Sequence, residues 1–326
     1  MAVKAQKKVV ATKTKASKTH SKKLVSLPKP KEVPVKEVMG KVFTLVLRRP
    51  RLGVYRQISS KAVESDVDSN WLGVRKRLFH SDTYREIDSL RTEARIFVAS
   101  KSLPSILKKG MYMVPKENQA MVQAKLDELK SKMDVLIHKF AHEEWESVVE
   151  AAKKPLGSQW NRGDYLSKRD VEQRFNMSWR WLTYDIPVDL DADTYKEQQE
   201  IAAKDWETAR EVWKGLLRNE FSEVVSHLVE RLKPSKDGKK KVLRDSAVTN
   251  ISDWINDFNP RNIENDTQLK ALVDKAQLLV KGVNPEVLRE DETARNNMRA
   301  HFETIKNTLE SLVVTEGSRE VSFDED

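Results

Sequence analysis

The sequence predicts a mainly α-helical protein, built as an elongated helical hairpin or bundle with coiled-coil character and a small two-stranded β element. Glycine and proline are few, at 10 and 11 in 326 residues, which favours long helices over turn-rich all-β folds. Apolar residues recur mainly three and four positions apart, the period of a helix with one buried face. Between residues 122 and 140 this spacing becomes a regular 4-3-4-3-4 seam, which is typical of coiled coils.

The two ends of the chain differ from its middle. Residues 1–40 contain no aromatic residue and hold eleven lysines against two glutamates, so they carry the whole net charge of +9 and the rest is formally neutral. A segment of this composition buries too little apolar surface to offset its ordering entropy. We therefore expect 1–40 to be a disordered Lys-rich tail, and 315–326 to be a short acidic tail.

Two long helices are predicted first. One is marked by Tyr84, Ile87, Leu90, Ala94 and Phe97. The next begins near Pro115, a residue suited to a first helical turn, and continues until Pro155. Its seam consists of Val122, Leu126, Leu129, Met133, Leu136 and Phe140.

A third long helix is predicted after Asp193 and ends before Pro234. Its apolar stripe consists of Trp206, Trp213, Leu217, Phe221, Val224, Leu228 and Leu232. If it is unbroken, its length is about 60 Å at 1.5 Å per residue. We expect the seam at 122–140 to be covered either by this helix or by another chain, and residues 41–233 to form one helical hairpin domain with two short strands.

A charged linker at 234–241 precedes a C-terminal helical segment, 242–314, which we expect to pack on the same body. Three amphipathic helices are predicted in it. Their apolar positions are Val248, Ile251, Ile255 and Phe258; Leu269, Leu272, Ala276 and Leu279, with Gly282 as a C-terminal stop; and Met298, Phe302, Ile305, Leu309 and Leu312.

Two segments, KVFTLVLR near residue 45 and FNMSWRWL at 175–182, alternate with period two and predict half-buried strands. Each needs a partner, so we expect them to pair with each other. Trp179 and Trp181 lie on the face of Phe175, which favours packing on the helices. A partner-facing patch and a base-stacking platform remain alternatives. Arg180 lies on the opposite face, where we expect it to be solvated.

The order of these elements resembles an uncharacterised family of bacterial and phage proteins, known only as a domain of unknown function. The resemblance spans roughly 42–312, and its most specific pieces are GMYMVP, leading into the seam helix, and the strand near Phe175. Members are often encoded beside MoxR-type AAA+ ATPases and von Willebrand factor A-type proteins. The resemblance therefore implies an AAA+ ATPase as partner, and it implies no catalytic residue.

Metal sites have two weak candidates. His138 and His142 are four residues apart on a predicted helix, a spacing that puts both on one face, but HKFAHEE is not HExxH. A calcium-loop spacing is formed by Asp189, Asp191, Asp193 and Glu200. Thr194 stands where that loop needs glycine, so helix capping by aspartate is the favoured interpretation.

Catalytic and cofactor motifs are not found. The chain has no cysteine, which excludes disulfides, thiolate metal sites and thiol nucleophiles. It has no Walker A or dinucleotide-binding glycine pattern. We therefore expect a protein that is not an enzyme and has no cofactor.

The lysine tail is the candidate nucleic-acid site, with Lys4, Lys7, Lys8, Lys13, Lys15, Lys18, Lys22 and Lys23 as its cations. A flexible polycation suits phosphate backbones but offers no base readout. An acidic protein partner, or no specific role, remains an alternative.

The leading hypothesis is a non-enzymatic helical adaptor or scaffold that serves an AAA+ ATPase assembly of a bacterium or phage. The alternative is a sequence-nonspecific nucleic-acid-binding accessory protein that acts through the tail. No apolar run approaches the roughly 20 residues that span a bilayer, so we expect a cytoplasmic protein without a membrane partner.

Overall fold

A computed structural model of the chain describes residues 25–28, 37, 39–60, 66–68, 70–105, 108, 110–183, 186–234 and 243–315. This part is mainly helical, as predicted, with a small β component. Most of the tail at 1–40, most of the linker at 234–241 and the acidic tail from 316 lie outside the described residues. The domain limits drawn from the sequence stay predictions.

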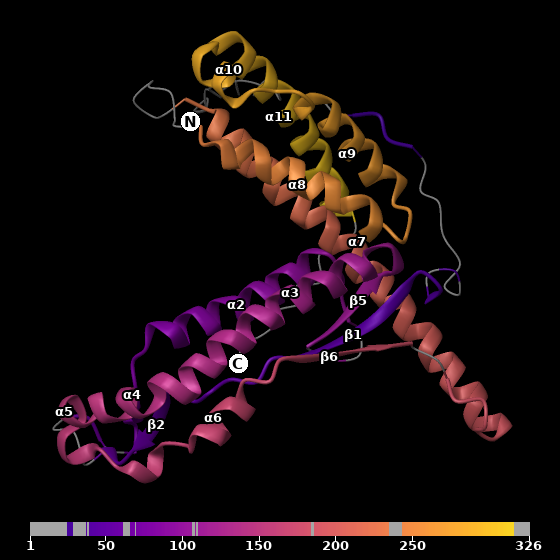
Figure 1. Ribbon diagram of the computed structural model, residues 1–326. Helices are drawn as coiled ribbons and strands as arrows, with labels where there is room; N and C mark the ends of the chain where they lie inside the picture. Colours follow the sequence, from indigo (N-terminus) through magenta and orange to yellow (C-terminus); the bar gives the residue numbers. More distant parts are fainter. Residues whose placement is uncertain are drawn as a thin grey trace, which may run out of the picture.

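The strands are β1 (Val42–Arg48), β2 (Tyr55–Ile58), β3 (Val74–Arg77), β4 (Leu103–Pro104), β5 (Met111–Pro115) and β6 (Ser178–Leu182). The first long helices are α2 (Asp82–Ser100) and α3 (Gln119–His138), followed by a π-helical turn (Lys139–Glu144), α4 (Trp145–Ala151), α5 (Lys153–Leu156) and α6 (Lys168–Arg174). The later helices are α7 (Ala192–Leu232), α8 (Asp245–Arg261), α9 (Thr267–Val280), α10 (Pro285–Glu290) and α11 (Glu292–Thr315). Two groups of helices, α2–α6 and α7–α11, diverge from the region of β1 and β5 (Figure 1).

The predicted pairing of the two distant strands is confirmed: β1 and β6 are antiparallel, with Val46 opposite Arg180. The prediction of only two strands is wrong, since β5 pairs with the other side of β1 and the sheet order is β4-β5-β1-β6. A separate ribbon of β2 and β3 was also not predicted. Each unpredicted strand has at most five residues, too few for a clear alternation.

The four-stranded sheet lies between two hydrophobic cores. Leu45 and Val114 belong to the core of α2–α6, whereas Val42, Leu103 and Met113 belong to the core of α7–α11. Successive side chains of a strand point to opposite faces, so neighbours such as Met113 and Val114 enter different cores. The sheet is therefore a wall that both cores share.

The seam of α3 is covered by α2. The seam residues Val122, Leu126, Leu129 and Met133 are buried in the core of α2–α6, whereas α7 packs mainly on α11 and α8. The expectation that residues 194–233 or another chain covers the seam is therefore wrong. The preceding amphipathic helix, joined to α3 through β4 and β5, provides the apolar face instead.

The seam departs from its predicted register at its C-terminal end, where a π-helical turn follows α3. A π turn holds one extra residue, so it rotates the following side chains relative to an α-helix. Ile137 is buried, whereas Leu136, predicted for that position, is only half-buried. Phe140 remains in the core, and Ala141, Trp145 and Val149 continue from Ile137 at intervals of four. The heptad pattern therefore stops near residue 133.

The predicted third helix is confirmed as α7, a continuous helix of 41 residues. Its apolar stripe is buried as predicted, except that Val225 takes the core position assigned to Val224. The three shorter helices correspond to α8, α9 and α11, and Gly282 follows α9 with a φ of +73°. A side chain would be strained there, which explains the stop.

One part of the predicted tail belongs to the fold. Val25 and Leu27 pack on the core of α7–α11, and the Val25 backbone N–H donates to Thr308 Oγ1 at 2.8 Å. The prediction that residues 1–40 contribute no core is therefore wrong at these positions. They are the apolar residues of a Lys- and Pro-rich segment, and burial is favourable for them.

The two cores are also joined by polar contacts. The buried Arg261 donates to both carboxylate oxygens of Glu220, at 2.8 and 2.9 Å, and to Ser102 O at 3.1 Å. Trp213 Nε1 donates to Pro104 O at 2.8 Å. These bonds connect α7 and α8 to residues 102–104, which comprise the end of the α2–β4 connection and β4 itself.

Among the described helices, none combines the length and the apolarity that crossing a bilayer requires.

Candidate nucleic-acid interface

The β2–β3 ribbon presents an exposed basic face. Tyr55 lies opposite Arg77 and Gln57 lies opposite Arg75 in the antiparallel register. Directly opposed residues share a face, so these four side chains point to the same side of the ribbon. All four are exposed, Tyr55 by 45%.

Two guanidinium groups of this face are held against one aromatic ring. The Cζ atoms of Arg75 and Arg77 lie 4.8 and 5.3 Å from the centroid of the Tyr55 ring, within the range of cation–π contacts. Arg77 Nη2 also donates to Tyr55 Oη at 2.7 Å. We call Tyr55, Arg75 and Arg77 the Tyr–Arg clamp. The clamp restricts the rotamers of both arginines before any ligand binds, which lowers the entropy cost of binding.

The inner face of the ribbon is anchored by an ion pair. Asp164 carries little exposed surface, and it lies 3.0 Å from Arg56 Nη1 and 2.5 Å from Lys76 Nζ. Lys76 also donates to Gln159 O. Asp164 is placed by a short 3₁₀ turn, Arg162–Asp164, whose start is capped by Asn161. The ribbon therefore projects from segment 157–165 with its clamp facing outward.

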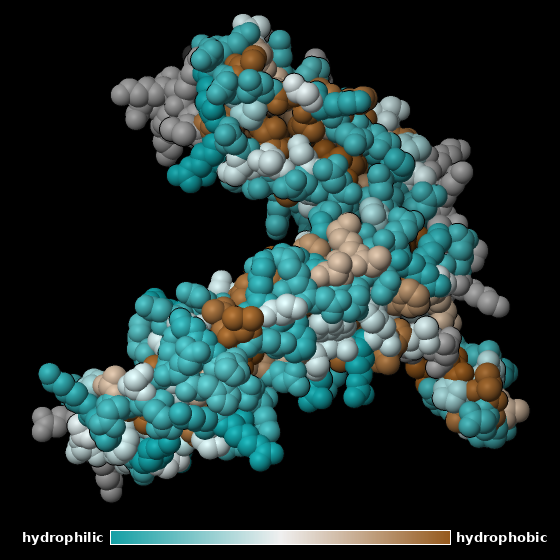
Figure 2. Space-filling model, viewed as in Figure 1, coloured by the Kyte–Doolittle hydropathy of each residue, from teal (hydrophilic) through white to brown (hydrophobic). Residues whose placement is uncertain are grey.

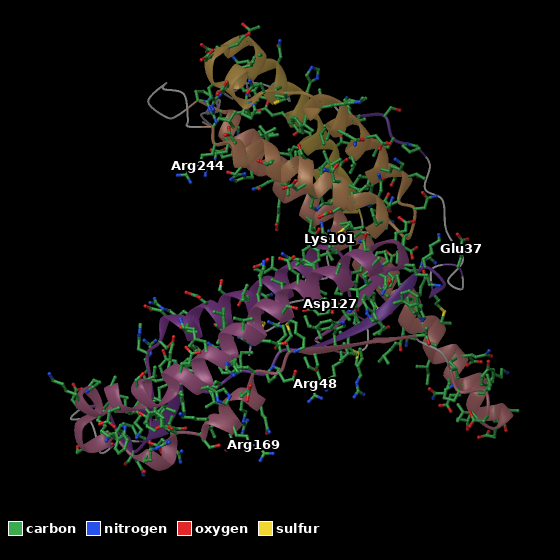
Figure 3. The ribbon with its side chains drawn as sticks, in the orientation of Figure 1. Glu37, Arg48, Lys101, Asp127, Arg169 and Arg244 are labelled. Carbon is green, nitrogen blue, oxygen red and sulfur yellow. The ribbon has the colours of Figure 1, made fainter. Side chains whose placement is uncertain are left out.

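The segment that contains the ribbon is rich in cations. Residues 48–77 hold eight basic and three acidic residues. Arg48, at the end of β1, and Arg169, in α6, are exposed and lie on the lower side of the same lobe in Figure 3. In Figure 2 the surface at this end of the molecule is mostly hydrophilic. The local excess of positive charge favours a polyanionic ligand.

A second arginine group joins the segment before β2 to α2. Arg49 and Arg91 each donate to the other's backbone carbonyl, at 3.2 and 3.1 Å, and Asp88 accepts two bonds from Arg91. Burial lowers the pKa of the Arg49 guanidinium, and the neighbouring charges of Arg91 and Arg95 lower it further. These residues hold segment 48–52 on α2. The exposed Arg51 guanidinium lies 3.8 Å from Asp88 on that helix.

The predicted lysine site lies outside the described residues: Lys4, Lys7, Lys8, Lys13, Lys15, Lys18, Lys22 and Lys23 all precede residue 25.

The predicted histidine pair is brought together by the end of α3. The rings of His138 and His142 stack with centroids 4.6 Å apart, and His142 Nε2 lies 3.2 Å from Glu172 Oε2. Both histidines are exposed. In the described part of the chain, no group of three or more His, Cys, Asp or Glu residues is placed to hold a metal ion.

The acidic run before α7 caps that helix. Asp191 accepts the backbone N–H of Thr194 at 3.0 Å, and its hydrogen bonds to Thr194 lower the pKa of its carboxyl. Asp193 lies in the first turn. All four residues of the proposed calcium spacing, including Asp189 and Glu200, are exposed. The capping interpretation is confirmed for Asp191.

Trp179 and Trp181 pack against the core of α2–α6 but are only half-buried. Their indole N–H groups both donate to Gln123 Oε1, at 2.9 and 2.8 Å. The rings are thereby fixed on α3. The interpretation of these tryptophans as packing residues is confirmed, although they are not fully buried, and Arg180 is exposed as expected.

The Tyr–Arg clamp was not predicted, although the sequence carries a signal for it. The segments RRPRLGVYR at 48–56 and VRKR at 74–77 are rich in arginine and flank a tyrosine. The net charge of residues 41–326 does not reveal this local excess of basic residues, because acidic residues elsewhere in the chain balance it.

Comparison with protein-family models, curated proteins and solved structures finds no match for this chain.

Proposed function

We propose that the protein is a sequence-nonspecific nucleic-acid-binding accessory protein whose folded contact surface is the β2–β3 ribbon. The observation that supports this proposal is the Tyr–Arg clamp, two arginines fixed on an exposed tyrosine at the outer face of a two-stranded ribbon. The lysine tail would add a second, flexible cationic contact.

The geometry of the ribbon suits a nucleic acid. A two-stranded β-ribbon fits the major groove of duplex DNA, and arginine forms paired hydrogen bonds with phosphate oxygens. Most of the polar side chains on the two strands of the ribbon are cationic, so we expect contacts with the backbone rather than with bases. Among the described residues of the outer face, Gln57 is the neutral amide that could contact a base edge. Binding should therefore depend on salt more than on sequence.

The test measures fluorescence anisotropy of a labelled duplex and a single strand at several salt concentrations. Wild-type affinity should fall steeply with salt. The double variant Arg75→Gln/Arg77→Gln should bind at least about tenfold more weakly, and the slope of log K against log salt should fall by about 2, for two lost phosphate contacts. The Tyr55 ring remains, so the ribbon should still fold.

The matched control is Lys130→Gln/Lys132→Gln, which removes the same charge from α3. Both lysines pair with acidic neighbours, Asp134 and Glu128. This variant should bind like wild type. Equal losses in the two double variants would mean that binding follows net charge alone, and the ribbon would then have no special role.

The contribution of the tail is tested by removing residues 1–24, which leaves the packed residues Val25 and Leu27 in place. Deletion should weaken binding and lower the salt slope, while the effect of the clamp variant persists. If the deletion alone abolishes all binding, the tail is the whole interface and the ribbon proposal is wrong.

We propose the helical adaptor as the second candidate, and one observation favours it. Residues 192–201 of α7 extend beyond the packed core, and eight of these ten residues are exposed, including Ile201; Figure 1 shows this end standing away from the other elements. An unpacked helix end offers a surface for a helical partner. A MoxR-type ATPase, the partner implied by the family resemblance, should then co-elute with the protein and change its turnover. Absence of both effects on co-expression with nucleotide excludes that partner.

A further inference from the structure

A cavity of about 450 Å³ opens beside the base of the β2–β3 ribbon. Three guanidinium groups from different elements line it: Arg51 precedes β2, Arg56 lies on β2, and Arg174 ends α6. Tyr55 forms part of the wall. Three cations that converge from separate elements are typical of a site for a compact anion with several acceptor oxygens.

The acidic residue of this cavity is already engaged. Asp164 pairs with Arg56 and with Lys76, which lies outside the cavity lining. The nearest carboxylate oxygen to Arg51, on Asp88, is 3.8 Å away, and the Arg51 side chain is 59% exposed. Arg174 is exposed at the helix end. The cavity therefore keeps a net positive charge.

The floor of the cavity is apolar and rigid. It includes Phe79 and Trp145, two buried rings in edge-to-face contact with centroids 5.3 Å apart. The Trp145 indole N–H donates to Leu166 O at 2.9 Å, so it is not available to a ligand. A volume of about 450 Å³ lies within the range of sites for small organic ligands. An apolar floor with cations above it suits a nucleoside that carries a phosphate.

A second cavity, of about 610 Å³, shares Arg56, Gln57 and Asp164 with the first and adds Lys76 and Arg162. Cations thus continue along the inner side of β2. A strand whose end lies in the first cavity would meet them with its next phosphates.

We propose that the first cavity binds a nucleoside phosphomonoester, the terminal phosphate of a nucleic-acid strand, with Arg51 and Arg174 as its principal contacts. This inference rests on the proposed function, because the ribbon holds the strand whose end the cavity receives. A phosphomonoester carries a charge of about −1.5 to −2 at pH 7 and three acceptor oxygens, whereas an internal phosphodiester carries −1. Three converging guanidiniums favour the terminal group over the internal one.

The experiment compares one labelled oligonucleotide in three forms: with a 5′-phosphate, with a 3′-phosphate and with hydroxyl groups at both ends. One phosphorylated form should bind about tenfold more tightly than the unphosphorylated form, the gain expected from one charge-assisted hydrogen bond. Arg174→Gln should remove this preference and leave binding of the unphosphorylated form unchanged. Arg51→Gln is the second variant and should do the same. Arg169→Gln, on an exposed position of the same helix, is the matched control and should keep the preference.

Free nucleoside monophosphate is the other source of this ligand, and it is tested as competitor. If it displaces only the phosphorylated form, the cavity binds the phosphomonoester from either source. If it does not compete, yet the preference is present, the cavity needs the strand.

The clamp variant Arg75→Gln/Arg77→Gln separates this inference from the proposed function. It should weaken all three oligonucleotides by the same factor and leave their ratio intact. Equal affinities of the wild type for all three forms, together with no binding of the free monophosphate, would overturn the inference while the ribbon proposal stands. A preference that survives both Arg174→Gln and Arg51→Gln would place the site elsewhere.

Discussion

Replacement of Arg261 by methionine should destabilise the junction between the two cores. Arg261 is 3% exposed, and its guanidinium donates to both oxygens of Glu220 and to the Ser102 carbonyl. Methionine keeps much of the length and the apolar stem but donates no hydrogen bond. The substitution therefore leaves the Ser102 carbonyl and most of the Glu220 carboxylate without a donor in the protein.

The size of the effect follows from these contacts. Breaking a fully buried ion pair by removing one partner costs about 3–5 kcal/mol. Here the Glu220 side chain is 31% exposed and keeps one bond from Trp254 Nε1, at 3.0 Å, so water and the indole compensate part of the loss. We expect a loss of about 3 kcal/mol in the free energy of unfolding.

The measurement is urea unfolding at 25 °C, followed by circular dichroism. The control is Arg85→Met, which removes an exposed i,i+3 pair with Asp82 and should leave the urea unfolding curve close to that of the wild type. The double variant Arg261→Met/Glu220→Gln should lose less than the sum of the single variants, because the two residues act as a unit. A loss below about 1 kcal/mol for Arg261→Met would refute the assigned role of the bond network.

Three further predictions concern single side chains. Gln123→Leu should lower the free energy of unfolding in urea by about 1–2 kcal/mol, because the half-buried indoles of Trp179 and Trp181 lose their shared acceptor. An unchanged free energy of unfolding would mean that water replaces the glutamine as acceptor. Asp191→Ala should speed amide hydrogen exchange in the first turn of α7, because the variant lacks the capping carboxylate. In the wild type, protection of these amides should fall as pH drops through the lowered pKa of Asp191, since protonation removes the cap. Unchanged exchange in the variant would contradict the capping role. Burial raises the pKa of Glu264 above its ordinary value of 4.5, so ionisation of this carboxyl costs the folded state more than the unfolded state. The free energy of unfolding of the wild type, relative to that of Glu264→Gln, should therefore decline as pH rises from 4.5 through the raised pKa. If urea unfolding gives parallel pH profiles for the two proteins, this prediction is wrong.

The helices were predictable because each buries one continuous stripe. The apolar positions assigned to α8 and α11, such as Ile255 and Phe302, are all buried, since a 3.6-residue period leaves little choice of face. The exceptions are exchanges between neighbouring positions inside regular α-helix: Ile137 is buried instead of Leu136, and Val225 instead of Val224. A straight α-helix drifts from a strict 3.5-residue repeat, which moves the buried position by one residue.

The sheet was predictable only where a strand was long enough to alternate. β1 has seven residues, and β6 carries two tryptophans on one side, so both were found. β5 ends at Pro115, beside a helix, and its MYMVP run has no polar alternation. Both of its faces meet a core, and such strands lose the periodic signal.

The candidate site was only partly predictable. A basic, nucleic-acid-binding character was expected from the N-terminal lysine tail, whereas the folded cations lie on the ribbon. What brings Tyr55, Arg75 and Arg77 together is the register of two four-residue strands separated by fifteen residues. A sequence without an alignment holds no information on that register, although the local density of arginine was available.

The wall shared by the two cores has a consequence for how this protein could be divided or recombined. A fragment that ends at residue 183 would keep the sheet but lose the helices that cover Val42, Leu103 and Met113, and so would expose an apolar sheet face. A fragment that begins at residue 186 would lose the apolar side chains on which Trp213 and its neighbours pack. Each half is thus an incomplete folding unit, and hydrogen exchange should report one cooperative opening for β1, β5 and the middle of α7. A chimera made with another protein would therefore have to keep the sheet together with the helices that pack on both of its faces.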